Sequence, residues 1–251
     1  MAGHSKWANI KHRKSAVDAK RSKIWSKLSK AIIVAAKMGG PDPDGNSRLR
    51  NAIADAKAAS VPKDNIARAI KKGAGETDGD NYEELIYEGY AADGVAVMCD
   101  ILTDNRNRTS PEVKKLFEKH GGKMGTTGCV SFMFDRKGLF LIEQSKIEED
   151  ALMELAMEAG AEDIASDDGH YEVTCNPDVF SDVSDAFEKA ELECASAQVT
   201  RIPQNTVELD VEGAKKVLKL IDALDDHDDV QKVSANFNIS DEVMAAVGDD
   251  A

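Results

Sequence analysis

The hydrophobic pattern of this chain changes its period once, near residue 82, and that change limits the folds open to it. Before residue 82, apolar residues recur at helical spacing, as with Ile24, Leu28 and Ile32 in the segment from Asp18 to Lys37. Beyond it, short runs typical of strands alternate with helical segments. The pattern therefore predicts an α+β protein whose N-terminal part is all helical.

Three helices are expected before residue 75. Gly39-Gly40-Pro41 ends the first, which begins at Asp18, and Val61-Pro62 separates a second helix over 47–59 from a third over 63–72. A Gly/Asp-rich linker follows at 74–81. Residues 1–17 carry too few apolar side chains to anchor them, so they are expected to be a loosely held arm. Together these segments predict a basic arm and a three-helix domain over 1–75.

A first α/β domain is expected to begin at residue 82. Residues 82–90 and 95–103 are predicted to form a β-hairpin, and Thr109-Ser110-Pro111 is predicted to open a helix that ends near His120. A strand is expected over 128–134. The later segments, a strand at 206–210, a helix at 211–224 and a strand at 230–237, are expected to complete the same sheet. This domain therefore combines 82–134 with 204–239.

A second α/β domain is expected to be inserted into the first. After a turn at 135–138, the order from 139 to 202 is strand, helix, strand, strand, helix, strand. That βαββαβ order is ferredoxin-like. The insertion is assigned to 135–203, which is tolerated where its two ends lie close together. Residues 240–251 are expected to be a frayed acidic tail.

Charge divides the chain more sharply than hydropathy does. Residues 1–75 carry 17 Lys/Arg and 5 Asp/Glu, a net of +12, whereas residues 76–251 carry 15 and 41, a net of −26. These sum to the −14 of the whole chain. Such asymmetry is typical of a protein with one nucleic-acid-binding end. The alternative is that two surfaces of opposite sign dock on each other.

The basic residues concentrate in the first 37 positions, where ten Lys/Arg face a single acid, Asp18, and where both tryptophans lie. Rings interleaved with cations are suited to hold bases and phosphates of irregular nucleic acid. The lysines of the first helix form a stripe that no glutamates interrupt, unlike an ordinary solvated face. The predicted nucleic-acid-binding residues are Lys6, Trp7, Lys11, His12, Arg13, Lys14, Lys20, Arg21, Lys23, Lys27, Lys30, Arg48 and Arg50.

Two loops of the first α/β domain are further candidates. Arg106, Asn107 and Arg108 are apt for phosphate or base contacts, although a salt-bridged turn explains them equally well. The glycine-rich loop, residues 121–128, follows a helix and opens a strand, which is the reverse of a nucleotide-binding loop. Its alternatives are contact with RNA or peptide and an ordinary helix cap. Its candidate contacts are Lys123, Gly125, Thr126 and Thr127.

No pattern in the chain indicates an enzyme, a cofactor or a metal site. The four cysteines, at 99, 129, 175 and 194, lack zinc-ligand spacing and are expected to be reduced and mostly buried. The aspartates around His227 lack the glycine and terminal glutamate of a calcium loop, which indicates a solvated helix end.

The compartment is inferred in the same way. The longest apolar run, Ala31–Ala36, is too short for a membrane span, and 1–18 has no secretory core. A cytoplasmic monomer is expected, with a mitochondrial transit peptide as the weaker alternative.

Short motifs throughout the chain resemble the YebC family, which includes the mitochondrial translational activator of cytochrome c oxidase. The match covers essentially the full length. It departs at Lys30-Ala31, Ala91 and Cys129. The matching motifs are Gly3-His4-Ser5-Lys6-Trp7, Ile10-Lys11-His12, Asp18-Ala19-Lys20-Arg21, Ser26-Lys27-Leu28, Asn46-Ser47-Arg48-Leu49-Arg50, Pro62-Lys63-Asp64-Asn65-Ile66, Tyr87-Glu88-Gly89-Tyr90, 102–109, Gly121-Gly122 and Asp228-Asp229-Val230-Gln231.

The resemblance implies three domains, no cofactor and no catalytic residue. It also implies one of two activities, DNA-binding transcriptional regulation or help to ribosomes translating difficult sequences such as proline runs. We expect a non-enzymatic, ribosome-associated translation factor that binds rRNA, with a DNA-binding transcriptional regulator as the alternative. A third hypothesis is a protein–protein adaptor that holds basic partners in an acidic cleft between domains.

Overall fold

The computed structural model describes residues 18–75, 81–167 and 169–248. Contacts divide the described chain into two compact units. One holds the residues up to 131 together with 209–235 and 241–248, and the other holds 132–208 with 236–240. The three helices and the first sheet thus share one unit, and the division into three domains stays a prediction. No helix within the described ranges has the length and apolar character needed to cross a membrane.

The three N-terminal helices are confirmed within two residues at each end. They are α2 (Asp18–Gly39), α3 (Ser47–Ala58) and α4 (Lys63–Gly73). Asn46, which is 6% exposed, ties two of them together. Its side-chain oxygen accepts from the Leu49 amide at 3.0 Å, and its Nδ2 donates to the carbonyls of Ala35 and Gly40, both at 2.8 Å. One buried amide therefore caps α3 and holds the end of α2.

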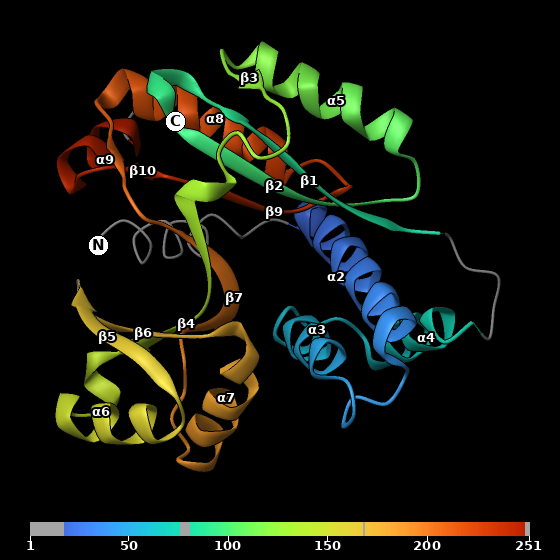
Figure 1. Ribbon diagram of the computed structural model, residues 1–251, viewed down its shortest axis with the longest axis vertical. Helices are drawn as coiled ribbons and strands as arrows, with labels where there is room; N and C mark the ends of the chain where they lie inside the picture. The colour runs from blue at the N-terminus through green and yellow to red at the C-terminus, as the bar shows by residue number, and fades with distance from the viewer. Residues whose placement is uncertain (1–17, 76–80, 168, 249–251) are drawn as a thin grey trace. The chain divides into compact units, whose positions relative to one another are not determined.

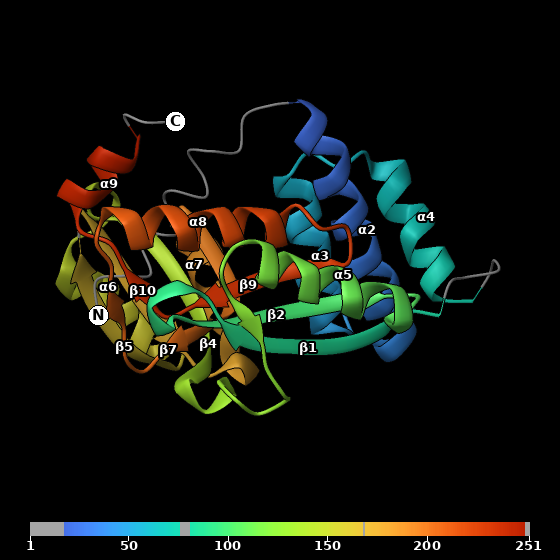
Figure 2. The ribbon, with the colours of Figure 1, turned by 90° about the horizontal axis from the view of Figure 1, so that it is seen from above.

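The first sheet has the strand order β3-β1-β2-β9 and all its pairs are antiparallel. Its strands are β1 (Glu83–Tyr90), β2 (Ala96–Thr103), β3 (Lys123–Met124) and β9 (Val230–Ala235). The helices α5 (Arg106–Lys119) and α8 (Val211–Asp225) cover one face of it (Figures 1 and 2). The expectation that the last part of the chain completes this sheet is confirmed for β9.

The predicted start of α5 at Thr109 is wrong, because the helix begins three residues earlier. Asn105 is its cap and accepts from the Arg108 amide at 3.1 Å. The Thr109 hydroxyl does not cap the helix but bonds to the buried carboxylate of Asp229 at 2.8 Å. Pro111 therefore lies inside the helix rather than at its first position. A tertiary contact has overridden the local capping signal.

The predicted strand at 128–134 and the predicted turn at 135–138 are also wrong. A short 3₁₀ turn at Ser131–Met133 leads into one continuous strand, β4 (Phe134–Glu143). Residues 135–138 pair with residues 202–199 of the neighbouring strand, so turn-forming residues are held extended by the ladder. Gly138 lies against Cys175 and Phe180, where a Cβ atom would come within 2.5 Å of the Cys175 sulfur. The glycine thus serves close packing rather than a turn.

The ferredoxin-like arrangement is confirmed in the second unit. Its sheet has the order β5-β6-β4-β7, all antiparallel, with α6 and α7 on one face (Figure 1). A ring stack between Phe140 and Phe180, with centroids 4.7 Å apart, lies in its core. The elements are α6 (Glu149–Glu158), β5 (Ala161–Asp167), β6 (His170–Cys175), α7 (Phe180–Lys189) and β7 (Ser196–Pro203).

Two expectations for the end of the chain are corrected. The strand predicted at 206–210 is the short β8 (Val207–Glu208), which pairs in parallel with β10 (Phe237–Asn238) instead of joining the first sheet. The tail predicted to be frayed contains α9 (Asp241–Gly248), which packs on α8. The remaining short 3₁₀ turns are η1 (Ala92–Gly94), η3 (Gln144–Lys146) and η4 (Pro177–Val179).

Candidate nucleic-acid interface

The structure describes only part of the predicted interface. Lys6, Trp7, Lys11, His12, Arg13 and Lys14 lie outside the described residues. Lys20 and Arg21 belong to the first turn of α2, but their side chains are not described. The helix lysines that follow them, both predicted loops and the two arginines of α3 can be placed.

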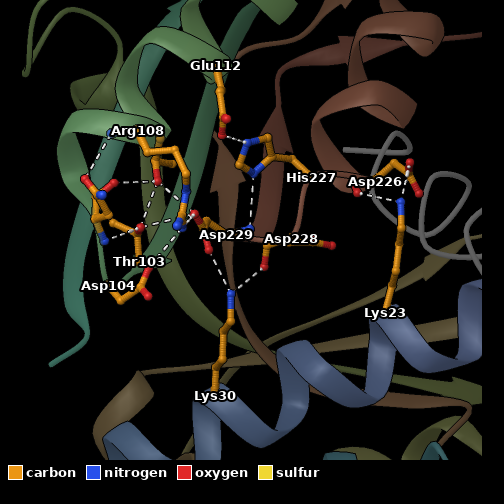
Figure 3. A network of polar contacts seen from close by, with 12 residues as sticks. Lys23, Lys30, Thr103, Asp104, Arg108, Glu112, Asp226, His227, Asp228 and Asp229 are labelled. Atoms are coloured by element: carbon orange, nitrogen blue, oxygen red, sulfur yellow. Dashed lines mark hydrogen bonds and ion pairs between the residues drawn. The ribbon is translucent and has the colours of Figure 1, made fainter. Parts of the chain in front are cut away.

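Three lysines of α2 contact the end of α8 and the turn that follows it, residues 225–229, which we call the acidic turn. Figure 3 shows Lys23 and Lys30. Lys23 Nζ lies 2.7 Å from a carboxylate oxygen of Asp226, and Lys27 donates to the carbonyl of Asp225. Lys30 Nζ lies 2.8 Å from a carboxylate oxygen of Asp229. The lysine stripe therefore meets the body's own acids, as the docking alternative predicts for these three residues.

The two ion pairs differ in burial. The side chains of Lys23 and Asp226 are 43% and 58% exposed, whereas those of Lys30 and Asp229 are 15% and 3% exposed. The hydrogen bond that Lys23 donates to Asp226 raises the pKa of Lys23. A pair as exposed as Lys23–Asp226 contributes about 0–1 kcal/mol and exchanges partners readily. The Lys30 pair is screened from water and is held in place.

Asp229 is the centre of a buried network, so the predicted solvated helix end is wrong at this residue. Its carboxylate accepts from Arg108 at 2.7 Å, from Thr109 at 2.8 Å and from Thr103 at 3.1 Å, in addition to Lys30 (Figure 3). Burial acts to raise the pKa of Asp229, but the hydrogen bonds from Lys30, Arg108 and Thr109 outweigh it and hold the pKa well below its ordinary value. One carboxylate thereby joins α2, β2, α5 and the acidic turn.

Arg108 belongs to this network, which favours the salt-bridge interpretation of its loop over nucleic-acid contact. Its guanidinium lies 2.9 Å from Asp104 as well as 2.7 Å from Asp229. The hydrogen bonds to these two carboxylates raise its pKa. Arg106 and Asn107, two residues and one residue earlier, are exposed and stay candidates.

His227 fixes the shape of the acidic turn. Its Nδ1 accepts the backbone N–H of Asp229 at 3.1 Å, and its Nε2 lies 3.1 Å from a carboxylate oxygen of Glu112 on α5 (Figure 3). Because Nδ1 accepts a hydrogen bond, the ring hydrogen is on Nε2, which donates a hydrogen bond to Glu112. The ring therefore sets the position from which Asp229 reaches Lys30.

The glycine-rich loop is held by a residue that the sequence did not single out as a site residue, Glu88 on β1. Its carboxylate, 3% exposed, accepts the backbone N–H groups of Gly128, Val130 and Ser131 at 2.8–2.9 Å. Burial acts to raise the pKa of Glu88, but these backbone hydrogen bonds lower it below its ordinary value. Its sequence signals are an acid at an alternating strand position and its place in the family motif Tyr87-Glu88-Gly89-Tyr90.

The loop fixed in this way presents its candidate contacts to solvent. Lys123, Gly125, Thr126 and Thr127 are all exposed, and Phe132 nearby in the chain is 69% exposed. The Tyr90 hydroxyl adds a hydrogen bond to the Cys129 carbonyl at 3.1 Å. The loop is thus a positioned surface with small side chains, not a simple helix cap.

The two arginines of α3 are engaged locally. Arg48 forms an ion pair with Glu84 of β1, and it lies 3.1 Å from the Met38 sulfur. Arg50 donates to the Pro43 carbonyl at 3.5 Å. Arg48 is half exposed, which leaves it accessible to a phosphate that competes with Glu84.

A hollow of about 710 Å³ opens between α2, α5 and the acidic turn. Lys23 and Lys30 line it from α2. Arg108, Lys115 and Lys119 line it from α5. This α2–α5 hollow is lined by cations from both helices and also by five acids, Asp104, Glu112, Asp226, Asp228 and Asp229.

The described residues offer no other chemistry. They contain no group of three or more His, Cys, Asp or Glu arranged to hold a metal ion. The four cysteines are unpaired, and burial raises the pKa of both Cys175 and Cys194 to about 11. Neither thiol is an activated nucleophile at neutral pH.

Comparison with known proteins covers nearly the whole chain. Residues 5–76 match the "TACO1/YebC protein N-terminal domain" and residues 82–237 match the "TACO1/YebC second and third domain". A "Probable transcriptional regulatory protein" of Rhodopirellula baltica is 58% identical over 98% of this chain and 100% of its own length. Another of that name from Geobacter sulfurreducens is 54% identical, with 97% and 98% covered.

A solved structure agrees with these matches. The crystal structure of a conserved hypothetical protein from Aquifex aeolicus has a TM-score of 0.84 and 49% identity, covering 95% of this chain and 99% of its own. The resemblance read from the short motifs is therefore confirmed along the chain. The protein belongs to the TACO1/YebC family.

Proposed function

We propose that this protein is a non-enzymatic nucleic-acid-binding regulator that works as a monomeric, cytoplasmic, ribosome-associated translation factor. The observation that carries the proposal is the charge division, +12 over residues 1–75 against −26 over residues 76–251. Polyanion binding by the basic end releases condensed counterions, which is the main source of sequence-independent affinity. The acidic remainder is repelled by surrounding phosphates and directs the contact to one end.

Within the basic end, the contacts of α2 divide the lysines into two roles. Lys30 is bound to the buried Asp229 and positions the acidic turn, so we assign it to structure. Lys23 has an exposed partner that a phosphate can replace at little cost. The proposed phosphate contacts are therefore Lys6, Lys11, Arg13, Lys14, Lys20, Arg21 and Lys23, with Trp7 and His12 as stacking rings.

The glycine-rich loop is proposed as a second point of contact with rRNA. The Gly128 amide at the end of the loop and the Val130 and Ser131 amides that follow it bind the Glu88 carboxylate, which fixes the end of the loop before it meets a partner. A loop ordered in advance loses less conformational entropy on binding. Its backbone is accessible because exposed residues such as Gly125 and Thr126 carry small side chains or none.

The runner-up is a DNA-binding transcriptional regulator, which the names of the relatives favour. Against it, a body of charge −26 opposes lying along a duplex, which carries one negative charge per about 1.7 Å of axis. The two functions differ in their preferred partner. Sedimentation through a gradient with ribosomes, in the presence of competing promoter DNA fragments, separates them.

The expected result is co-sedimentation with ribosomes that excess promoter DNA does not abolish. The variant Lys11→Ala/Arg13→Ala/Lys14→Ala should lose this co-sedimentation with no change in thermal stability. A matched control, Lys146→Ala/Lys189→Ala/Arg201→Ala, removes the same charge from the ferredoxin-like unit and should bind normally. Selective retention on promoter DNA supports the alternative instead, and ribosome binding that survives deletion of residues 1–20 supports an adaptor.

A further inference from the structure

One segment of the acidic body is basic. Residues 106–123, which comprise α5 and the start of the glycine-rich loop, carry six of the 15 Lys/Arg of residues 76–251 and only two of their 41 Asp/Glu. The segment has a net charge of +4 within a body of −26. A local reversal of sign this large marks a surface directed at an anion.

Four of the six cations, Arg106, Lys115, Lys119 and Lys123, have no counter-charge in the part of the chain that the structure describes, and two of these, Lys115 and Lys119, lie on one helix. Arg108 is paired with Asp104 and Asp229, and Lys114 lies 3.9 Å from Glu118. Glu112, three residues before Lys115 on the helix, is bonded to His227 instead, and Glu118, three residues after it, lies near Lys114. Lys115 and Lys119 are both exposed and lie four residues apart on one helix, where like charges repel.

The field around this pair is positive on both sides of α5. Burial, then the charges of Lys119 and Lys219, lower the pKa of His120. Lys219 belongs to the adjacent helix α8 and is exposed. Five acids line the α2–α5 hollow, and four of them are engaged: Asp104 by Arg108, Glu112 by His227, Asp226 by Lys23 and Asp229 by Lys30. The fifth, Asp228, is exposed.

The position of the pair connects it to the basic end of the chain. Lys115 and Lys119 line the α2–α5 hollow, and Lys23 lines it from α2. α2 begins at Asp18, five residues before Lys23, which is about 7.5 Å along the helix axis. The point at which the basic arm joins the helix therefore lies close to the rim of the hollow.

We propose that Lys115 and Lys119 bind phosphates of the same nucleic-acid strand that the N-terminal arm holds. This inference rests on the proposed function and adds a second contact surface to it. Lysine side chains carry no ring to stack on a base, so we assign the pair to phosphates and not to base reading. Continuity with the arm favours a nucleic-acid strand over an acidic polypeptide as the occupant.

The test measures the salt dependence of binding with the full-length protein. Kd for a fluorescent 30-nucleotide oligouridylate is measured by anisotropy between 50 and 200 mM KCl, for the wild type and for Lys115→Ala/Lys119→Ala. The control, Lys146→Ala/Lys189→Ala, removes two exposed lysines of the ferredoxin-like unit and changes the net charge equally. A 30-residue polyglutamate serves as the probe for an acidic protein.

Each lost phosphate contact reduces the slope of log K against log salt by about 0.7 on a single strand. The double variant should therefore bind more weakly with a slope shallower by about 1.4, so that its deficit shrinks about sevenfold between 50 and 200 mM KCl. The control should keep the wild-type slope. A wild-type slope in the double variant overturns the inference, as does a loss confined to polyglutamate. Absence of RNA binding by the wild type would instead refute the proposed function.

Discussion

Replacing Asp229 by asparagine tests whether the buried network fastens α2 to the acidic turn. The carboxylate is 3% exposed and accepts from four groups, two of them charged. The asparagine amide has nearly the shape of the carboxylate but no charge. Its NH₂ group faces hydrogen-bond donors that the carboxylate had accepted from. Removing one partner of a buried ion pair costs about 3–5 kcal/mol. Arg108 still has its ion pair with Asp104 in the variant, and its side chain is 44% exposed. We therefore expect a destabilisation at the lower end of this range, about 3 kcal/mol.

The assay is urea unfolding followed by far-UV circular dichroism and tryptophan fluorescence. For a chain of this size, about 3 kcal/mol also lowers Tm by about 6–12 °C. Asp226→Asn is the matched control, because Asp226 is 58% exposed and its pair should contribute no more than about 1 kcal/mol. The double variant Asp229→Asn/Lys30→Met should be less destabilised than the sum of its single variants, because the two residues share one interaction.

The pH dependence of the same variant follows from the pKa of Asp229. That pKa is lowered from an ordinary value of 3.8, so the stabilisation is fully present above about pH 4 and is lost as the pH falls through the lowered pKa. The stability difference between wild type and Asp229→Asn should therefore be constant from pH 7 to 5 and shrink only below about pH 4. The reasoning is refuted if Asp229→Asn costs no more than Asp226→Asn, or if the effects of Asp229→Asn and Lys30→Met add.

Three further substitutions test local features of the fold. Glu88→Gln should cost about 1–3 kcal/mol and speed amide hydrogen exchange in the glycine-rich loop, and unchanged protection would show that other contacts hold the loop. Gly73→Ala places a Cβ atom 2.3 Å from the Ile33 carbonyl oxygen and should destabilise by about 1–3 kcal/mol, whereas Gly45→Ala, with open space around it, should not. Asn46→Ala should lower the free energy of unfolding by at least about 1–2 kcal/mol in thermal unfolding. A loss of less than about 0.5 kcal/mol would mean that water replaces its three hydrogen bonds.

Elements that local pattern determines were predictable. The apolar spacing of α2 and the strand-helix order from 139 to 202 are carried by neighbours within a few turns or strands, and both were confirmed. The errors arose where a partner distant in the sequence determines the local structure. The local sequence predicts Thr109 as a helix cap, but its hydroxyl donates to Asp229, which lies 120 residues later. The local sequence likewise predicts a turn at 135–138, but β7 pairs with these residues and holds them extended.

The candidate interface shows the same limit. The charge division predicted that the lysine face meets either nucleic acid or an acidic surface, and no local signal ranks these two partners. The contacts of Lys23 and Lys30 join residues about 200 positions apart. Glu88 was missed for a related reason, since a buried carboxylate that binds backbone amides leaves no periodic trace in the sequence.

The great separation between the α2 lysines and the acidic turn has a consequence during synthesis. At about 5–20 residues per second, a ribosome makes Asp226 about 10–40 s after Lys23, because 203 residues lie between them. The helix is therefore complete long before its internal acids exist. Throughout that interval its lysines have no acidic turn to contact, and their contacts with residues 225–229 form only when β9 joins the sheet.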